Sequence, residues 1–238
     1  MSTHAAAPGT PMRIVIPVYD QVDMLDVCGP SEMFGWPTLP GPDPQRRMFQ
    51  VDLVAEKPGL VTFNSGFVFQ VSAGLDPPRA ADALWVPGGD PDSLKRIIAE
   101  GDKSPYLDFL KRQARQSKWI CSVCEGALLL AAAGLLDGFL ATTHWAFIPY
   151  LMAYHPAVRI ADGHPRFVVD RDRLTGGGIS SGLDESLKLI ELLAGQDTAI
   201  SVQQTTQYYP EPPVASAIPN VITTPMLHPP PHSPGAPR

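Results

Sequence analysis

The fold of this chain is decided by one stretch, Ile120-Cys121-Ser122-Val123-Cys124-Glu125-Gly126-Ala127-Leu128. Its first residues are apolar and predict a buried strand over residues 118–123. A helix follows at once, predicted over residues 125–136, with small residues at its start. A strand that passes directly into a helix makes a tight turn, and small neighbours leave room for it. The pattern is typical of a nucleophile elbow, which holds one side chain, here Cys124, above the edge of a sheet.

Strand and helix patterns alternate on both sides of this turn. Short apolar runs predict strands at residues 13–18, 49–55 and 83–86, and helices are predicted at residues 92–100, 105–116, 181–194 and 197–207. Turn residues at 64–66 and 170–172 each predict a hairpin. Apolar strands that alternate with helices predict an α/β fold, with a mostly parallel sheet sandwiched by helices. In such folds the ligand binds at the carboxyl ends of the strands.

Composition suggests one domain with a tail. The chain has 238 residues, 44% of them hydrophobic, which is enough for a sizeable core. Ten of its 27 prolines follow Tyr209, and proline removes an amide donor from helices and strands. We therefore predict a flexible N-terminus at residues 1–11, a single domain at 12–209 and a proline-rich arm at 210–238. The arm is expected to be disordered or to lie along a partner subunit.

The charge balance excludes some partners. The 24 acidic and 18 basic residues give a net charge of −6, which argues against a nucleic acid or an anionic membrane as partner. No apolar run approaches the roughly 18 residues of a membrane-spanning helix. The N-terminus does not resemble a signal peptide, and three cysteines form no even disulfide framework. We therefore expect a cytoplasmic protein with free thiols.

Two interpretations of Cys124 are equally open on physical grounds. It is a nucleophile, with a thiol pKa lowered by the amides at the start of the following helix, or it is a small buried apolar residue. Cys121 and Cys28 are expected to be packing residues. The spacing of Cys121 and Cys124 is C-x-x-C, but no second pair or histidine cluster accompanies it, so no metal site is predicted.

Two carboxyl groups are candidates for proton transfer to or from such a thiol. Asp26 lies between Leu25 and Val27, just before a Gly-Pro helix start, and is expected to be half-buried. It is either an acid of the site or a helix N-cap. Glu125 is directly beside the thiol, and its alternative role is a favourable charge at a helix start.

Several other residues are candidates for substrate contacts. Gly88 and Gly89 end an apolar strand, so their amides form either an oxyanion hole or an ordinary turn. His144 is either a core histidine or a partner of Cys124. The run Gly176-Gly177-Gly178 lacks the spacing and the lysine of a phosphate loop, and predicts a close approach of backbone to the site.

At these residues the sequence resembles the ThiJ/PfpI superfamily, and within it the isocyanide hydratase branch. The motifs that carry the resemblance span roughly residues 12–213 and are Leu25-Asp26-Val27 with Gly29-Pro30, Pro87-Gly88-Gly89, Ser122-Val123-Cys124 with Gly126, residues 131–136, Ala141-Thr142-Thr143-His144-Trp145 and residues 174–179. The superfamily shares its flavodoxin-like fold with class I glutamine amidotransferases.

The resemblance implies hydration of an isocyanide to an N-substituted formamide through a thioimidate, with Cys124 as nucleophile and a protonated Asp26 as acid. It further implies a homodimer, a small-molecule substrate bordered by Gly178 and Ile179, and no metal or organic cofactor. One position departs from the branch: Glu125 stands where threonine is expected. Glu125 is therefore a third candidate for the catalytic set, and it puts the identity of the substrate in doubt.

Three alternative functions follow from the same residues. A glyoxalase-like enzyme of this fold would carry glutamate in the early loop, where this chain has Asp26. A related hydratase or lyase would use Glu125 on another small molecule. A non-catalytic thiol sensor or regulator would keep the fold, and the regulators that resemble this domain carry a DNA-binding helical module behind it, where this chain has its proline-rich arm.

Overall fold

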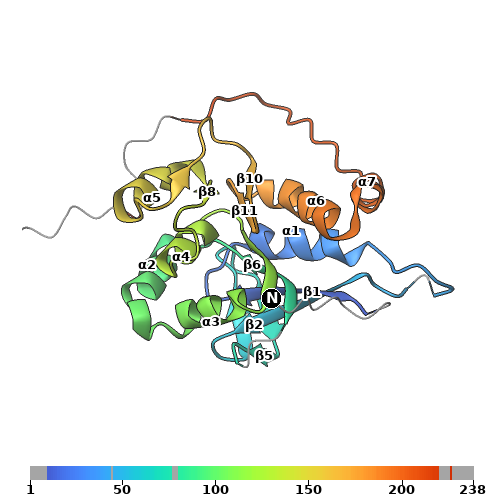
Figure 1. Ribbon diagram of the computed structural model, residues 1–238, viewed down its shortest axis with the longest axis horizontal. Coiled ribbons are helices and arrows are strands. Elements are labelled where there is room, and N and C mark those ends of the chain that lie inside the picture. The colour runs from blue at the N-terminus through green and yellow to red at the C-terminus, as the bar shows by residue number, and fades with distance from the viewer. Residues whose placement is uncertain (1–9, 44, 77–79, 220–225, 227–238) are drawn as a thin grey trace, which may run out of the picture.

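The central sheet of the molecule has seven strands. The computed structural model describes residues 10–43, 45–76, 80–219 and 226, and its sheet order is β10-β11-β7-β6-β1-β2-β5 (Figure 1). The strands are β1 (Met12–Val18), β2 (Phe49–Ala55), β5 (Ala73–Gly74), β6 (Ala81–Val86), β7 (Ser117–Ser122), β10 (Phe167–Asp170) and β11 (Arg173–Gly176). All neighbouring pairs are parallel except β10 and β11, which confirms the predicted fold class.

Helices cover both faces of this sheet (Figure 1). One group packs together as α1 (Met24–Gly35), α6 (Ser181–Ala194) and α7 (Gln196–Thr205), and the other as α2 (Pro91–Ala99), α3 (Pro105–Ala114) and α4 (Gly126–Ala132). Smaller elements are the hairpin of β3 (Gly59–Thr62) and β4 (Val68–Val71), the pair β8 (Leu140–Ala141) and β9 (Arg159–Ile160), the 3-10 helices Gly101–Lys103 and Trp145–Phe147, and α5 (Ile148–Tyr154).

Strand β6 lies in the core and leads directly to the glycines at positions 88 and 89. All six of its residues are buried, as expected for a central parallel strand covered on both faces. Trp85 packs edge-on against Phe34 of α1, and its indole N–H donates to the carbonyl of Asp26 at 3.1 Å. The same contact therefore fixes the start of α1 against the strand that leads to Gly88.

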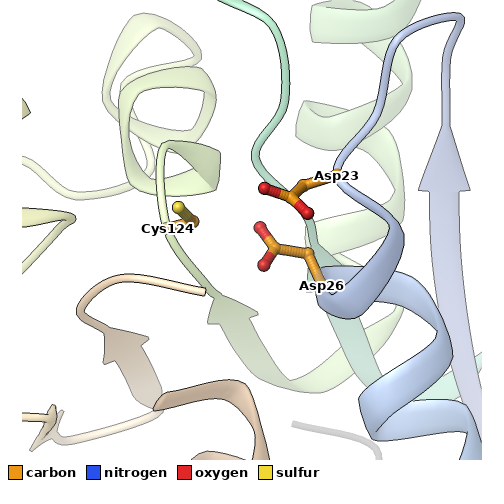
Figure 2. A group of neighbouring side chains, drawn as sticks. All are labelled: Asp23, Asp26 and Cys124. Carbon is orange, nitrogen blue, oxygen red and sulfur yellow. The ribbon is translucent and has the colours of Figure 1, made fainter. Parts of the chain in front are cut away.

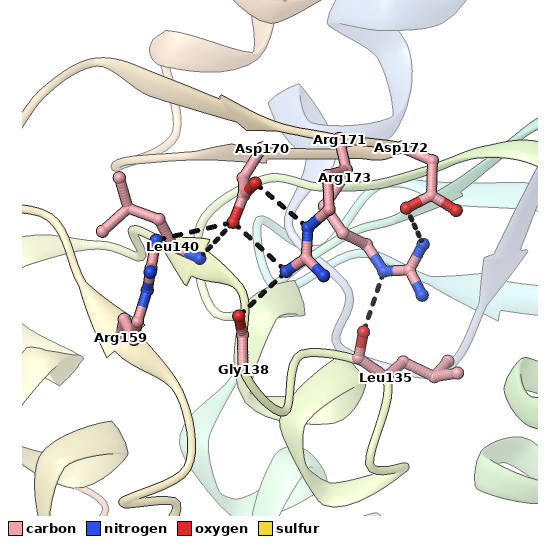
Figure 3. Close-up of polar contacts among 8 residues, drawn as sticks. All are labelled: Leu135, Gly138, Leu140, Arg159, Asp170, Arg171, Asp172 and Arg173. Atoms are coloured by element: carbon pink, nitrogen blue, oxygen red, sulfur yellow. Dashed lines mark hydrogen bonds and ion pairs between the residues drawn. The ribbon is translucent and has the colours of Figure 1, made fainter.

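A polar cluster fixes the turn of the β10–β11 hairpin (Figure 3). Asp170 accepts the amide of Leu140 at 2.7 Å and pairs with Arg171 at 3.2 Å. These bonds hold the pKa of Asp170 below its usual value. Arg173 donates to the carbonyl of Leu135 at 2.8 Å. These contacts attach the hairpin turn to the segment that follows α4. From this turn, β11 runs to Gly176.

Two local predictions were wrong. Helix α4 ends at Ala132 rather than Leu136, because Gly134 takes a positive φ of 71° that stops the helix. Cys28 is exposed and is not a packing residue.

The arm after α7 is partly described. Residues 208–219 form no helix or strand, as their proline content predicts, and they arch from the end of α7 across the top of the molecule in Figure 1. Met226 is only 2% exposed and packs with the core. The remaining arm residues and the predicted flexible residues 1–9 lie outside the described residues. Within the described residues, no helix combines the length and the apolar character needed to cross a membrane.

Candidate active site

Cys124 occupies a strained turn between β7 and α4. Its φ is +55°, in the left-handed region that residues other than glycine rarely adopt. The Cys124 amide donates to the carbonyl of Gly177 at 2.8 Å, and the Gly126 amide donates to that of Val123 at 2.9 Å. A Cβ on Gly126 would lie 2.0 Å from the carbonyl oxygen of Val86, so only glycine fits there. This is the geometry of the predicted elbow, and such strain of about 1–3 kcal/mol persists only where the surroundings hold it.

Asp26 faces the thiol from the first turn of α1 (Figure 2). The side chain is fully buried, and one oxygen, Oδ2, accepts the amide of Gly88 at 2.8 Å. The other oxygen, Oδ1, is buried without a hydrogen-bond partner. Burial, followed by the nearby charge of Asp23, raises the pKa of Asp26 well above its usual value. Burial therefore favours the protonated form of Asp26, whose side chain points toward Cys124 (Figure 2) and does not cap its own helix.

Glu125 lies on the opposite side of the glycine turn and contacts the thiol directly. Its side chain is 6% exposed, and its carboxyl hydrogen-bonds to the Cys124 thiol and the Gly89 amide. Burial raises the pKa of Glu125 to about 7, against these hydrogen bonds, which lower it. A carboxyl group with this pKa titrates near neutral pH and lies within hydrogen-bond distance of the thiol.

The pKa of Cys124 differs from the sequence-based expectation. Amides at a helix start were expected to lower it, but burial and then the charges of Asp26 and Glu125 raise it well above the usual value. Among the strongest influences on this pKa, only the hydrogen bond from the amide of Ile179 lowers it. Helix α4 has seven residues, and its short dipole does not offset desolvation beside two carboxyl groups. The resting thiol therefore keeps its proton and needs a base.

Gly88 and Gly89 lie between the two acids. The amide of Gly88 donates to Asp26 and that of Gly89 to Glu125, so in this structure both amides orient carboxyl groups. A Cβ on Gly88 would lie 2.4 Å from Oε2 of Glu125, and one on Gly89 would lie 2.7 Å from the carbonyl oxygen of Gln21. The residue type at both positions is thus explained by close packing at the site.

The remaining predicted residues line a cavity next to Cys124. His144 packs on Gly178, where a Cβ would lie 2.5 Å from the imidazole Cδ2. Its Nδ1 accepts the amide of Ala146 at 3.2 Å, and burial lowers the pKa of His144, which keeps the ring neutral. The groups that act most strongly on Cys124 are Asp26, Glu125 and Ile179. Nothing in this geometry links His144 to Cys124 as a dyad, and both His144 and Gly178 line the cavity.

Two site residues escaped the sequence analysis. Asp23 is half-buried, donates its amide to the carbonyl of Gly88 at 3.0 Å and has a pKa raised by burial. Tyr19 is buried, and its hydroxyl donates to the carbonyl of Pro87 at 3.3 Å. Asp23 is the N-cap residue of α1, and an aspartate just before a helix is a common N-cap, so its position was open to prediction from the sequence.

A buried acid on α6 was also missed. Glu185 is fully buried, and neither carboxyl oxygen has a hydrogen-bond partner. A Cβ on Gly176 would lie 1.7 Å from its Oε2, so the carboxyl group rests on the backbone of β11. Burial, and then the charge of Asp26, raises the pKa of Glu185 well above its usual value.

One set of side chains near the elbow has the donor types of a metal site. Asp23, Asp26 and Cys124 each present one ligand atom, and the three atoms lie within 4.8 Å of one another (Figure 2). Zinc binds thiolates and carboxylates, so this set could hold a metal ion. It would have to lose the protons that the raised pKa values of all three groups retain. The same protons are what an acid–base site needs.

Comparison with known proteins identifies the family. Residues 12–192 match the DJ-1/PfpI family, which is three quarters of the chain and includes the elbow and both acids. The chain belongs to the DJ-1/PfpI family. Its fold neighbours agree: a ThiJ/PfpI family protein from Pseudomonas syringae has a TM-score of 0.74 at 31% identity, over 86% of this chain and 78% of that one. The resemblance inferred from the motifs is thereby confirmed.

Relatives of this DJ-1/PfpI protein include an enzyme and regulators. The isonitrile hydratase of Pseudomonas putida is 35% identical over 216 residues, which is 91% of this chain and 87% of that protein. The HTH-type transcriptional regulator GbdR of Pseudomonas aeruginosa is 30% identical over 145 residues, 61% of this chain but only 37% of the regulator. The enzyme thus matches nearly end to end, while the regulator matches in one part.

Proposed function

We propose that this protein hydrates an isocyanide, R–N≡C, to an N-substituted formamide, R–NH–CHO, with Cys124 as the nucleophile. The observation that carries the proposal is a buried thiol on a strained elbow between two carboxyl groups of different proton affinity. Similarity to the Pseudomonas putida isonitrile hydratase over nearly the whole chain supports the substrate class.

Glu125 activates the thiol in the first step. Because the thiol donates to the Glu125 carboxylate, its proton moves to Glu125 when the sulfur attacks the terminal carbon of the isocyanide. A general base works best when its pKa is close to the operating pH, and the pKa of about 7 meets this condition. The expected threonine would lack a carboxylate, so this residue adapts the site to a thiol of raised pKa.

Asp26 supplies the proton that completes the addition. The isocyanide carbon forms a C–S bond with Cys124 and takes the proton of Asp26, which gives the thioimidate R–N=CH–S. The Asp26 carboxylate then takes a proton from water, and the hydroxide adds to the same carbon. Nitrogen receives the proton held by Glu125, and Glu125 takes one from the new hydroxyl as the C–S bond breaks. Glu125 then returns that proton to the departing thiolate. The products are R–NH–CHO and the free Cys124 thiol, with Asp26 again protonated and Glu125 again a carboxylate.

We also propose the setting in which this reaction takes place. The substrate is a small molecule, no nucleic acid or cofactor takes part, and the protein acts as a cytoplasmic homodimer, as the family resemblance implies. The net charge of −6 supports the exclusion of a polyanionic partner. Light scattering of the purified chain checks the dimer.

The test is direct turnover of cyclohexyl isocyanide, with the formamide followed by proton NMR. Cys124→Ala is expected to abolish turnover, and Asp26→Asn to lower kcat by about 100-fold or more, because it removes one acid–base group. The matched control is Cys28→Ser, which removes an exposed thiol far from these contacts and should keep wild-type activity. Absence of turnover in the wild type, or equal rates in Cys124→Ala, would refute the proposal.

A further inference from the structure

A cavity of about 370 Å³ lies beside the turn that holds Cys124. Three lining residues hydrogen-bond to Cys124. The carbonyl of Gly177 accepts the Cys124 amide, and the hydroxyl of Thr143 donates to the Cys124 carbonyl at 2.8 Å. The amide of Ile179 donates to the Cys124 sulfur. A fourth, Leu25, directly precedes Asp26. A molecule held in this cavity therefore lies next to both proposed catalytic residues.

Apolar and polar side chains line this cavity together. Its apolar members are Leu25, Trp145, Pro165, Ile179 and Ile218, and its polar members are Thr143, His144, His164, Arg166, Ser180 and Ser181. Four of the six polar side chains are already occupied by other groups of the protein.

The occupied groups are identifiable. The guanidinium of Arg166 pairs with Asp184 and donates to the hydroxyl of Ser180 at 3.3 Å. Thr143 and His144 use a hydroxyl and a ring nitrogen on neighbouring backbone. Leu25 and Ile179 are 36% and 38% exposed, which is unusual for large apolar side chains beside a catalytic thiol and indicates surface left for a ligand.

One lining residue comes from the proline-rich arm. Ile218 lies in the extended segment after α7. Every other lining residue precedes it by more than 35 positions in the sequence. The arm is held at its start, where the hydroxyl of Tyr208 donates to Asp184 at 3.3 Å. Beyond Ile218, Met226 is buried in the core. Residues 208–219 cross the top of the molecule from the end of α7, as Figure 1 shows.

We infer that this cavity binds the R group of the isocyanide, that it takes an apolar ring or branched group, and that Ile218 of the arm closes its outer side and determines specificity. The inference rests on the proposed function for the name of the reacting group. The size agrees, since a cavity of about 150 Å³ takes benzene, so this one has room for a six-membered ring with its isocyanide. The proposed role also gives the arm a function: it completes the substrate site.

Substitution at Ile218 tests the specificity. Ile218→Trp fills the cavity from the arm and is expected to lower kcat/KM for cyclohexyl isocyanide about tenfold or more, through KM, because pocket volume discriminates between substrates by such factors. Turnover of methyl isocyanide should change by less than about twofold. The control is Val214→Trp, which lies on the same arm, is 76% exposed and does not line the cavity. Equal selectivity in the two variants would overturn the inference.

A second readout does not depend on hydration. In a Cys28→Ser background, the alkylation rates of Cys124 by iodoacetamide and by N-cyclohexylmaleimide are compared. Ile218→Trp should slow the bulky reagent relative to the small one, and Val214→Trp should leave the ratio unchanged. A changed ratio without any isocyanide turnover would support the cavity and refute the hydratase. Turnover with neither selectivity nor ratio affected by Ile218→Trp would refute the role of the arm and keep the hydratase.

Discussion

Glu125 and Glu185 are two buried glutamates with similar packing and different surroundings. Each rests on a glycine backbone, with Oε2 at 2.4 Å from a Cβ built on Gly88 and at 1.7 Å from one built on Gly176. Glu125 contacts a thiol and an amide, and its pKa rises to about 7. Glu185 has no hydrogen-bond partner for either oxygen, and its pKa is raised well above the usual value.

The difference teaches what makes a buried acid useful. Burial raises the pKa of both groups, but hydrogen bonds to the charged form bring that of Glu125 back toward neutral pH. A group that titrates near neutral pH can exchange protons during turnover. Glu185 has no such partners, and its pKa stays well above its usual value. Burial alone therefore identifies an unusual residue, and the partners decide whether it works as a base.

The largest effect expected from this comparison is on activity. Glu125→Gln removes the proton acceptor of the thiol and should lower kcat/KM about 100-fold or more, whereas Glu185→Gln should stay within about twofold of wild type. Wild-type activity should rise with pH through about 7, because the working form of Glu125 is the carboxylate, and this rise should disappear in Glu125→Gln. Rates of isocyanide hydration between pH 5 and 9 measure both. Equal losses in the two variants would mean that Glu185 also takes part.

A smaller effect concerns the two glycines. Gly88→Ala and Gly176→Ala are each expected to lower the free energy of unfolding by about 1–3 kcal/mol, because the new methyl group overlaps a packed neighbour. The three atoms nearest to a Cβ on Gly176 all belong to the Glu185 side chain, whereas a Cβ on Gly88 would also lie 2.7 Å from the backbone nitrogen of Glu125. Adding Gly176→Ala to a Glu185→Ala variant should therefore cost little, and adding Gly88→Ala to Glu125→Ala should still destabilise.

Urea unfolding of these single and double variants makes the measurement. Gly35→Ala is the matched control, because nothing lies within 4 Å of a Cβ at the end of α1, and it should unfold like wild type. If Glu185→Ala fails to accommodate the methyl group on Gly176, the two residues are not in the contact described.

The sequence predicted the first glutamate and not the second, for a physical reason. Glu125 follows Cys124, so the elbow motif alone brings it to the site. Glu185 lies beside Asp184 in a polar stretch, and residue polarity alone would predict that this stretch faces solvent. Its helical spacing from Gly182 and Leu189 places it on the buried face, so periodicity held a signal that residue polarity concealed. Which of two adjacent acids faces a sheet depends on the orientation of the helix, and that orientation comes from packing.

The same distinction holds for the fold. Apolar runs with proline or small residues at their borders predicted the longer strands and most helices, because these signals are local, whereas the two-residue strands β5, β8 and β9 were not predicted. Asp23 and Ile218 reach the site only through the packing of α1 and the course of the arm, which no local pattern encodes. Chemistry that lies within a motif was therefore predictable, and the shape of the substrate cavity was not.

The smallest effect is the contribution of Glu185 to stability as a function of pH. Its pKa is raised above 4.5 in the folded state, so above pH 4.5 the unfolded chain loses this proton while the folded chain keeps it. The folded state then binds more protons, and the free energy of unfolding falls as pH rises, by up to about 1.4 kcal/mol per pH unit, until the folded-state pKa is passed. Below pH 4.5 both states are protonated and the contribution is constant. Glu185→Gln cannot ionise, so the difference in unfolding free energy between this variant and wild type should grow from pH 5 to pH 8. Parallel pH curves would show that Glu185 ionises in the folded protein as easily as in the unfolded chain, and would remove the contrast with Glu125.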